Sequence, residues 1–261
     1  MIKLRAWCIA LAIFTAVLVP LWQIIAALGF RFDVWDISFA MRKMSVDWWT
    51  YVRYASIGAG LIALALSGIL RPRHGIGVVA GLAALIIPIV ATQQSERVFQ
   101  LARSLPAIHD ISTDRVDPPM FTETVMALRE AEDSNPAHYV GKIKKGWNGE
   151  PDQLVSDLQA DAYPDLIPIS TERSPVESFN RSLELVRDFG WDIQTQDREN
   201  LLIEATATTF WYGFKDDVII RIRPDDGGSI VDVRSLSRFG GSDFGKNADR
   251  IRKFRDRGNW S

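Results

Sequence analysis

The sequence predicts an α+β fold, in which a three-span α-helical membrane anchor precedes an antiparallel β-sheet domain with helices on one face. Three observations lead to this prediction. The first 92 residues contain three long uncharged stretches. Charge divides at the same place, with 8 Lys and Arg against 3 Asp up to residue 92, and 22 basic against 29 acidic residues beyond it. Between residues 201 and 238, alternating apolar and polar side chains indicate strands with two different faces.

The uncharged stretches are long enough to cross a bilayer. They lie near residues 7–30, 54–70 and 75–92, so residues 1–92 form the predicted anchor. A helix rises about 1.5 Å per residue, and the hydrocarbon core is about 30 Å thick. A cleaved signal peptide is the alternative for the first stretch, but this stretch is too long and lacks a clear A-x-A cleavage site. The single cysteine, Cys8, excludes an intrachain disulfide.

Residues 31–53, between the first two stretches, are amphipathic. Spacings of four and three residues place one set of side chains on a single helical stripe. This set consists of Ile37, Met41, Met44, Trp48 and Tyr51. Two interpretations are open: a surface-lying helix that binds lipid, or a connector that packs against its own helical bundle.

The basic residues beside the spans favour a cytoplasmic N-terminus. With the N-terminus inside, Lys3, Arg5, Arg71 and Arg73 are cytoplasmic, and four basic residues (31, 42, 43 and 53) lie outside, so the numbers are equal. The cytoplasmic four are concentrated in two very short flanks, whereas the other four are diluted by aspartates. Three spans then place the C-terminal domain outside the cytoplasm. The sequence therefore predicts a multi-pass protein of the bacterial inner membrane with a periplasmic domain. The acidic balance of that domain argues against nucleic acid as a partner.

Residues 93–107 are expected to form an extended tether, and residues 108–261 the soluble domain. A short helix is expected at about 121–132. The best-marked helix begins at Ser174-Pro175-Val176-Glu177, which combines an N-cap serine, a proline at the first helical position and a capping-box glutamate. Gly190 is expected to end it. Its predicted buried stripe consists of Val176, Phe179, Leu183 and Val186.

Three strands are expected at roughly 201–210, 217–223 and 230–238, followed by a last helix from about Ser242 to Gly258. The alternation within these strands gives one apolar face and one polar, arginine-rich face, which indicates an antiparallel sheet covered by helices on one side. Matching of the apolar faces places Arg221 across from Asp232 and Arg223 across from Glu204. Each such pair stabilises a sheet by about 0.2–1 kcal/mol.

The end of the third strand is left with two arginines that have no predicted carboxylate partner. Guanidinium groups, hydroxyls and the free amides of a helix start suit a phosphate or carboxylate ligand, so the sequence predicts an anion site here. The residues of this predicted site are Arg234, Ser235, Ser237, Arg238, Asp243 and Asn247. The alternative is that Asp243 caps the last helix and that one arginine pairs with a nearby aspartate.

A second polar cluster lies at the start of the soluble domain. A histidine beside carboxylates can act in acid–base catalysis, whereas clusters of Asp, Ser and Thr also form local turns. Its residues predicted to contribute to the ligand site are His109, Asp110, Thr113 and Asp114. No catalytic residue, metal site or cofactor is predicted, because the sequence has no glycine-rich phosphate loop, no nucleophile elbow and no paired cysteines.

Several segments, taken in order, resemble the family called domain of unknown function 1499 (DUF1499), found in bacteria and plants. They are IHDISTDRVDPPMF (108–121), NPAHY (135–139), AYPDLIP (162–168), GWDI (190–193), TTFWYGFKDDVIIRIRP (208–224) and VDVRSLSRFGGSDFGKNADRI (231–251). The resemblance implies a shared fold and a shared polar site, to which Asp216 and Asp217 also belong. It implies no activity, since none is established for the family.

The leading hypothesis is therefore a membrane-tethered binding domain, without enzymatic activity, that captures an anionic small molecule or a membrane protein partner. One alternative is a hydrolase or isomerase that uses His109 with a nearby aspartate. Another is a structural partner of membrane proteins that acts through its three-helix anchor. All three include the lipid bilayer as a partner.

Overall fold

The computed structural model describes the chain except for residues 1, 71, 147–150 and 261. The chain forms two compact units. The first comprises Met1–Gln100 with Phe210–Gly213, and the second comprises Leu101–Thr209 with Phe214–Ser261. The short segment between the second and third uncharged stretches is described from Pro72 onward, because Arg71 lies outside the described residues.

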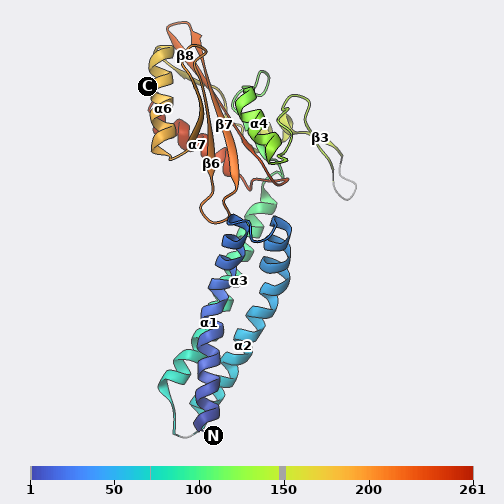
Figure 1. The fold of residues 1–261 in the computed structure, drawn as a ribbon, viewed down its shortest axis with the longest axis vertical. Coiled ribbons are helices and arrows are strands. Elements are labelled where there is room, and N and C mark those ends of the chain that lie inside the picture. The colour runs from blue at the N-terminus through green and yellow to red at the C-terminus, as the bar shows by residue number, and fades with distance from the viewer. Residues whose placement is uncertain (1, 71, 147–150, 261) are drawn as a thin grey trace. The chain divides into compact units, whose positions relative to one another are not determined.

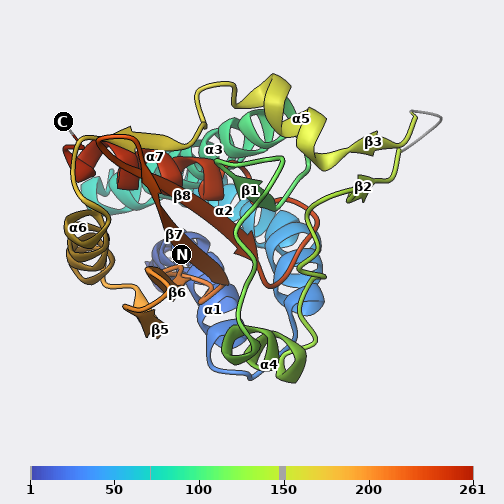
Figure 2. The same ribbon diagram turned by 90° about the horizontal axis from the view of Figure 1, so that it is seen from above.

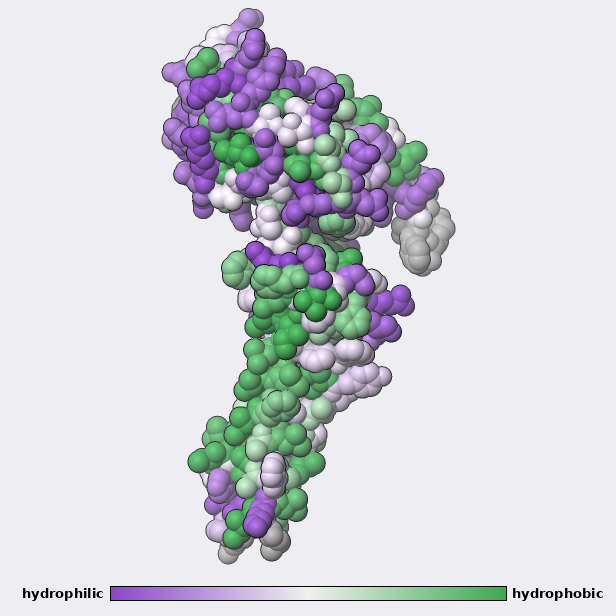
Figure 3. Space-filling view, in the orientation of Figure 1, coloured by the Kyte–Doolittle hydropathy of each residue, from purple (hydrophilic) through white to green (hydrophobic). Residues whose placement is uncertain are grey.

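The first unit is helical. α1 (Ile2–Arg31) is followed by the consecutive helical segments η1 (Phe39–Trp48), α2 (Trp49–Leu64) and η2 (Ala65–Ile69), and then by α3 (Gly75–Ser104) (Figure 1). Three of the described helical runs, Ile2–Arg31, Phe39–Ile69 and Gly75–Ser104, are long and apolar enough to cross a membrane. Their apolar side chains dominate the surface of this unit (Figure 3).

Small residues hold these helices together. Ala12, Ala16, Ala59, Ala63 and Ala84 form one buried cluster. The backbones also approach closely, since a Cβ atom on Gly60 would lie only 2.8 Å from the Gly81 carbonyl oxygen. Dense glycine and alanine at helix contacts is the pattern expected of transmembrane packing.

The amphipathic segment after α1 packs against its own bundle. Trp22 Nε1 donates a hydrogen bond to the Met44 carbonyl at 2.9 Å, and Met44 is buried. The stripe predicted from α-helical spacing is interrupted, because Met41, Trp48 and Tyr51 are exposed. The reason is that residues Phe39–Trp48 form a π-helix, whose wider turn does not follow the α-helical period. These contacts support the connector interpretation.

Residues 93–104 are helical rather than extended. α3 continues through them to Ser104, so most of the predicted tether belongs to this helix. The segment contains no Gly or Pro, and its three Gln and two Arg residues favour helix. Pro106 follows two residues after the helix ends, as a proline that cannot continue a helix commonly does.

The second unit contains an antiparallel sheet in the order β1-β8-β7-β6-β5, with β4 also paired to β8. The strands are β1 (Asp110–Ser112), β4 (Ile169–Thr171), β5 (Asp192–Asp197), β6 (Leu202–Thr208), β7 (Lys215–Asp225) and β8 (Gly228–Ser237). β2 (Ile143–Lys144) and β3 (Gln153–Leu154) form a separate small hairpin, which leads into α5 (Val155–Ala162). The three predicted strands correspond to β6, β7 and β8. β1 and β4 are three residues long, too short to show an alternating pattern.

Helices α6 (Pro175–Asp188) and α7 (Lys246–Gly258) cover the apolar face of the sheet, as predicted (Figures 1 and 2). α6 begins with the predicted capping box between Ser174 and Glu177. Phe179, Leu183 and Val186 are buried, but Val176 is 58% exposed. Val176 shares the helical face of Phe179 and Leu183, but it lies in the first turn of α6 and stays exposed there.

The second face of the sheet is also covered. α4 (Glu123–Ala131) and the chain around it lie on the side opposite α6 and α7 (Figures 1 and 2). Phe121 and Val125 pack there on Ile219 and Leu236. The polar face predicted from the alternation is therefore an interior surface with a small apolar centre.

The β7–β8 pairing is as predicted, with Arg221 across from Asp232. The β6–β7 pairing was predicted wrongly, because Glu204 lies across from Ile219 rather than Arg223. The connection has the expected six residues but lies two residues earlier in the chain, because Thr208 pairs with Lys215. The shift is an even number of residues, so every side chain keeps its predicted face.

Candidate functional site

Strand β8 sends its polar side chains in two directions. Successive residues of a strand point to opposite faces, so Arg234 and Arg238 lie on the α4 face and Ser235 and Ser237 on the α7 face. The residues predicted to form one anion site are therefore divided between the two sides of the sheet.

Arg234 is fully buried and its guanidinium is occupied by internal acceptors. It donates to both carboxylate oxygens of Asp110, at 2.9 and 3.0 Å, and to the Pro119 carbonyl at 3.0 Å. The rings of Phe121 and Tyr139 lie 5.3 and 5.5 Å from its Cζ atom. Asp110 comes from β1, so this bidentate pair joins the edge strand to β8.

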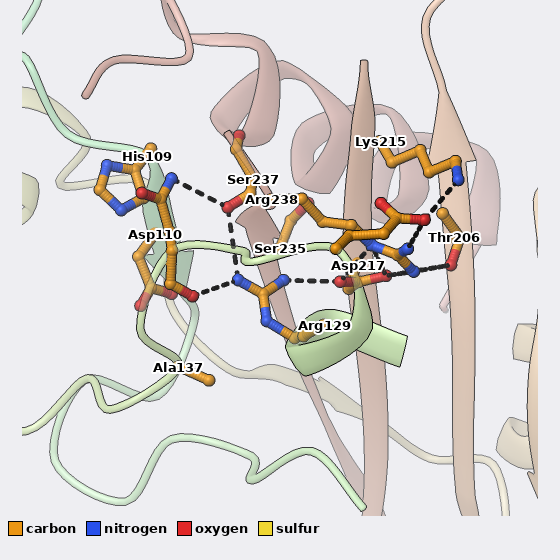
Figure 4. A network of polar contacts seen from close by, with 12 residues as sticks. His109, Asp110, Arg129, Ala137, Thr206, Lys215, Asp217, Ser235, Ser237 and Arg238 are labelled. Carbon is orange, nitrogen blue, oxygen red and sulfur yellow. Dashed lines mark hydrogen bonds and ion pairs between the residues drawn. The ribbon is translucent and has the colours of Figure 1, made fainter. Parts of the chain in front are cut away.

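A second cluster is centred on the buried carboxylate of Asp217 (Figure 4). Arg129 of α4 donates to it at 2.6 Å, and Arg238 donates to it at 2.7 Å. Thr206 adds a hydroxyl hydrogen bond at 3.0 Å. Burial lowers the pKa of Arg129 from its usual value, and the neighbouring Asp217 opposes that shift. Two arginines on one carboxylate fasten α4 to the centre of the sheet.

The edge of this cluster reaches solvent. Arg238 also pairs with Glu132 at 2.9 Å, and Lys215 pairs with the same carboxylate at 2.6 Å. Farther along the face, Arg221 and Arg223 share Asp232, at 3.0 and 2.8 Å. Arg223 thus has a carboxylate partner, although not the Glu204 that was predicted.

Glu204 holds the start of α4. Its two carboxylate oxygens accept hydrogen bonds from the backbone N–H and the hydroxyl of Thr122, at 2.6 and 2.5 Å. Thr122 is the N-cap residue of α4. A carboxylate at this position is favourable, because the first N–H groups of a helix have no partner within the helix.

On the α7 face, Asn247 connects the remaining predicted residues. It accepts a hydrogen bond from Ser235 at 2.8 Å and donates to Ser237 at 3.0 Å. Asp243 accepts from the backbone N–H of Asn247 at 2.8 Å, so it caps the start of α7 as the alternative prediction proposed. Burial raises the pKa of Asp243 to about 6.

His109 does not form the acid–base pair considered from the sequence. Its Nε2 lies 3.4 Å from Lys142 Nζ, and its Nδ1 is buried without a partner among the described residues. Asp110 forms ion pairs with Arg234 and Lys142 instead. Asp114 pairs with Arg223 and accepts a hydrogen bond from the backbone N–H of Val116. Burial, followed by the charge of Lys142, lowers the pKa of His109. Thr113 extends the pairing of β1 with β8, because its hydroxyl accepts a hydrogen bond from the Val233 N–H at 2.9 Å.

Residues 110–257 match the family described as protein of unknown function (DUF1499), which is more than half of the chain. The chain belongs to the DUF1499 family. The match begins at β1 and ends within α7, so the DUF1499 region contains the whole six-stranded sheet and both of its helical covers. The three membrane-capable helices lie outside it. A search of curated proteins gives no match to the chain.

The charges on the α4 face of the DUF1499 domain balance. The ion pairs described there join seven cationic side chains to six carboxylates, and the buried Glu204 is a seventh carboxylate. Within the described ranges, three His, Cys, Asp or Glu side chains are nowhere arranged to hold a metal ion. An anion at Arg234 would have to displace Asp110.

A groove of about 540 Å³ lies beside α4. It is lined by Glu123, Met126, Ala127, Arg129, Glu130, Asp133, Ser134, Asn135, Pro136 and Ala137. Met126 is 42% exposed, and Glu123, Glu130 and Asp133 are exposed without an ion-pair partner among the described side chains. The groove therefore combines an apolar patch with three free carboxylates.

Sequence reasoning missed the residues that cover the α4 face. Arg129, Lys142 and Glu132 come from α4 and the following loop, where no periodic pattern assigns them to the sheet. One signal was present: Arg234 and Arg238 had no predicted carboxylate partner on the sheet and required one from elsewhere, and a long irregular segment was available to cover this face.

Proposed function

We propose that this chain is a membrane-tethered binding domain whose partner is a membrane protein that docks a basic, partly apolar segment into the α4 groove. The observation that carries the proposal is the set of three unpaired carboxylates, Glu123, Glu130 and Asp133, around the exposed Met126. Their charge complements lysine or arginine side chains, and Met126 offers an adaptable apolar contact.

Contacts within the domain fix the position of Arg129 in the groove. Arg129 lines it, yet the Arg129 guanidinium is committed to Asp217 at 2.6 Å and to the Asn135 carbonyl at 2.7 Å. Its charge is therefore neutralised internally and does not repel a basic partner. A pre-formed surface of this kind binds with little loss of conformational freedom.

An anionic ligand at Arg234 and Arg238 stays a prediction that this proposal does not use. Both guanidinium groups are buried and already bound to Asp110 or Asp217. An anion would gain contacts with them only by leaving a buried carboxylate unpaired, which costs several kcal/mol.

The groove is tested by peptide binding to the intact chain in detergent. Two amphipathic peptides of equal length serve as probes, one with leucine and lysine and the other with leucine and glutamate, measured by fluorescence anisotropy. The lysine peptide is expected to bind and the glutamate peptide is not. The triple variant Glu123→Lys, Glu130→Lys, Asp133→Lys is expected to lose binding.

The matched control reverses three exposed carboxylates elsewhere: Asp188→Lys, Asp225→Lys and Asp226→Lys. It changes the net charge equally and is expected to retain binding. Equal loss in both triple variants would show that the attraction is non-specific and would refute the groove as the site.

We extend the proposal to location: the three membrane-capable helices anchor the chain in a bacterial inner membrane, with the DUF1499 domain in the periplasm. The basic flanks at residues 3–5 and 71–73 support a cytoplasmic N-terminus. A C-terminal alkaline phosphatase fusion, active only outside the cytoplasm, is expected to be active. Activity of a C-terminal cytoplasm-specific reporter instead would reverse the orientation.

A further inference from the structure

One face of α1 carries a groove of about 280 Å³, which is lined by residues of α1 and by His74. Its lining includes Arg5, Ala6, Ile9, Ala10 and Ile13, whose spacings of one and three residues place them on a single helical face. Ala6 and Ala10 are four residues apart and have the smallest side chains of this set. They leave the hollow between the larger isoleucines.

The length of the groove along α1 is close to the thickness of one leaflet of the hydrocarbon core. From Arg5 to Ile13, α1 rises about 12 Å at 1.5 Å per residue. Half of a hydrocarbon core is about 15 Å. In a bilayer an apolar hollow on a spanning helix is next to acyl chains rather than water, and an unfilled hollow loses dispersion contacts. An acyl chain is therefore the chemically matched occupant.

The end of the groove is polar and basic. His74 lies there with Arg5, whose Nη1 donates to the Pro72 carbonyl at 2.7 Å and is thereby held in place. Nδ1 of His74 accepts a hydrogen bond from the Gly77 N–H at 3.2 Å, so the neutral imidazole carries its proton on Nε2 and remains a donor. Both side chains can donate to a phosphate oxygen.

The positive charge of Arg5 has no neighbouring carboxylate in this part of the sequence. The sequence contains no acidic residue from 1 to 32 or from 48 to 95. Arg5 to Asp33 spans about 42 Å of helix, beyond the reach of an ion pair. This end of the anchor therefore differs from the α4 face, where every described arginine has a carboxylate partner.

We propose that this groove binds one acyl chain of an anionic phospholipid and that Arg5 and His74 hold its phosphate. The ligand is a lipid rather than free phosphate, because the apolar hollow and the basic end are continuous. The inference concerns the anchor alone and does not depend on the partner proposed for the α4 groove.

The test is lipid binding to the intact chain in detergent, followed by native mass spectrometry with phosphatidylglycerol or phosphatidylcholine. Phosphatidylglycerol is expected to bind about fivefold more tightly, since one charged arginine near an anionic lipid contributes about 1 kcal/mol. The variant Arg5→Gln, His74→Gln is expected to remove this preference. Inorganic phosphate is expected not to compete.

The variant Ala6→Leu, Ala10→Leu fills the hollow and is expected to lose both lipids. Two matched controls keep the proposal falsifiable: Lys3→Gln, Arg73→Gln removes two nearby charges, and Ala55→Leu enlarges an exposed alanine of α2. Both are expected to bind as the parent chain does. Unchanged lipid retention in the filled-groove variant, or an equal loss of preference in Lys3→Gln, Arg73→Gln, would overturn the inference.

Discussion

The two faces of the DUF1499 sheet are both buried, but different forces hold their covers in place. On the α6–α7 face, Val218, Ile220, Val231 and Val233 form an apolar core with Phe179 and its neighbours. On the α4 face, buried ion pairs surround a small apolar centre. Apolar burial is non-directional and tolerates approximate fit, whereas buried charges must each be paired. The α4 face therefore depends on the correct placement of individual residues.

The largest expected effect is on the α4 face. Asp110→Ala leaves Arg234 and Lys142 buried without their carboxylate, so we expect the free energy of unfolding to fall by about 3–5 kcal/mol. Urea unfolding of the intact chain in detergent measures it. The control is Asp165→Ala, which removes a partner of the partly exposed Arg252 and is expected to cost about 1 kcal/mol or less. Similar losses in both variants would contradict the difference in burial.

A cavity on the apolar face is expected to cost slightly less. Phe179→Ala removes a buried ring from α6, and such substitutions destabilise by about 3 kcal/mol or somewhat more. Val176→Ala on the same helix is expected to stay within about 0.5 kcal/mol, because Val176 is exposed. Equal effects at the two positions would show that α6 is turned differently on the sheet.

The start of α4 gives an intermediate effect. Glu204→Gln keeps the shape of the side chain but weakens the hydrogen bonds to Thr122, and we expect a loss of about 1.5–3 kcal/mol. Hydrogen exchange is expected to increase in α4 before it increases in α6. Uniform exchange across both helices would contradict separate attachment of the two covers.

The contributions of His109 and Asp243 to stability are expected to depend on pH in opposite ways. Burial lowers the pKa of His109 below 6.5, so its contribution to stability is present above pH 6.5 and is lost as pH falls through the folded-state pKa. Relative to the parent chain, His109→Gln is therefore expected to become less sensitive to acidification below pH 6.5. An unchanged pH profile in urea unfolding would contradict the buried, neutral imidazole.

The contribution of Asp243 to stability changes with pH in the opposite direction. Burial raises its pKa from 3.8 to about 6, so its contribution is present below pH 3.8 and is lost as pH rises through about 6. Asp243→Asn is expected to flatten the stability profile between pH 4 and 6. If the parent chain instead gains stability relative to Asp243→Asn over this range, the assigned direction is wrong.

The smallest expected effect is at the solvent edge of the α4 face. Lys215→Ala removes one of two cations on Glu132, and Arg238 remains as a partner. A partly exposed pair of this kind contributes about 0–1 kcal/mol. A larger loss in urea unfolding would show that the ion-pair network is coupled through to its edge.

The sequence predicted the faces of the sheet better than it predicted their covers. The alternation in β7 and β8 placed Arg221 across from Asp232 correctly, because side-chain period and apolar burial determine register. The partner of Arg223 was wrong, since nothing in the sequence fixes the six-residue β6–β7 loop. Arg129 and Asp110 reach the sheet from distant segments, and single-chain spacing does not reveal such long-range ion pairs.

The most direct test of the buried pairing is a double-mutant cycle between Asp110 and Arg234, followed by urea unfolding of the intact chain in detergent. Each single substitution to alanine is expected to cost about 3–5 kcal/mol, and the double substitution about as much as one of them, which gives a coupling energy of about 3 kcal/mol. Additive single effects, with coupling below about 0.5 kcal/mol, would contradict the claim that these two buried charges hold β1 to β8.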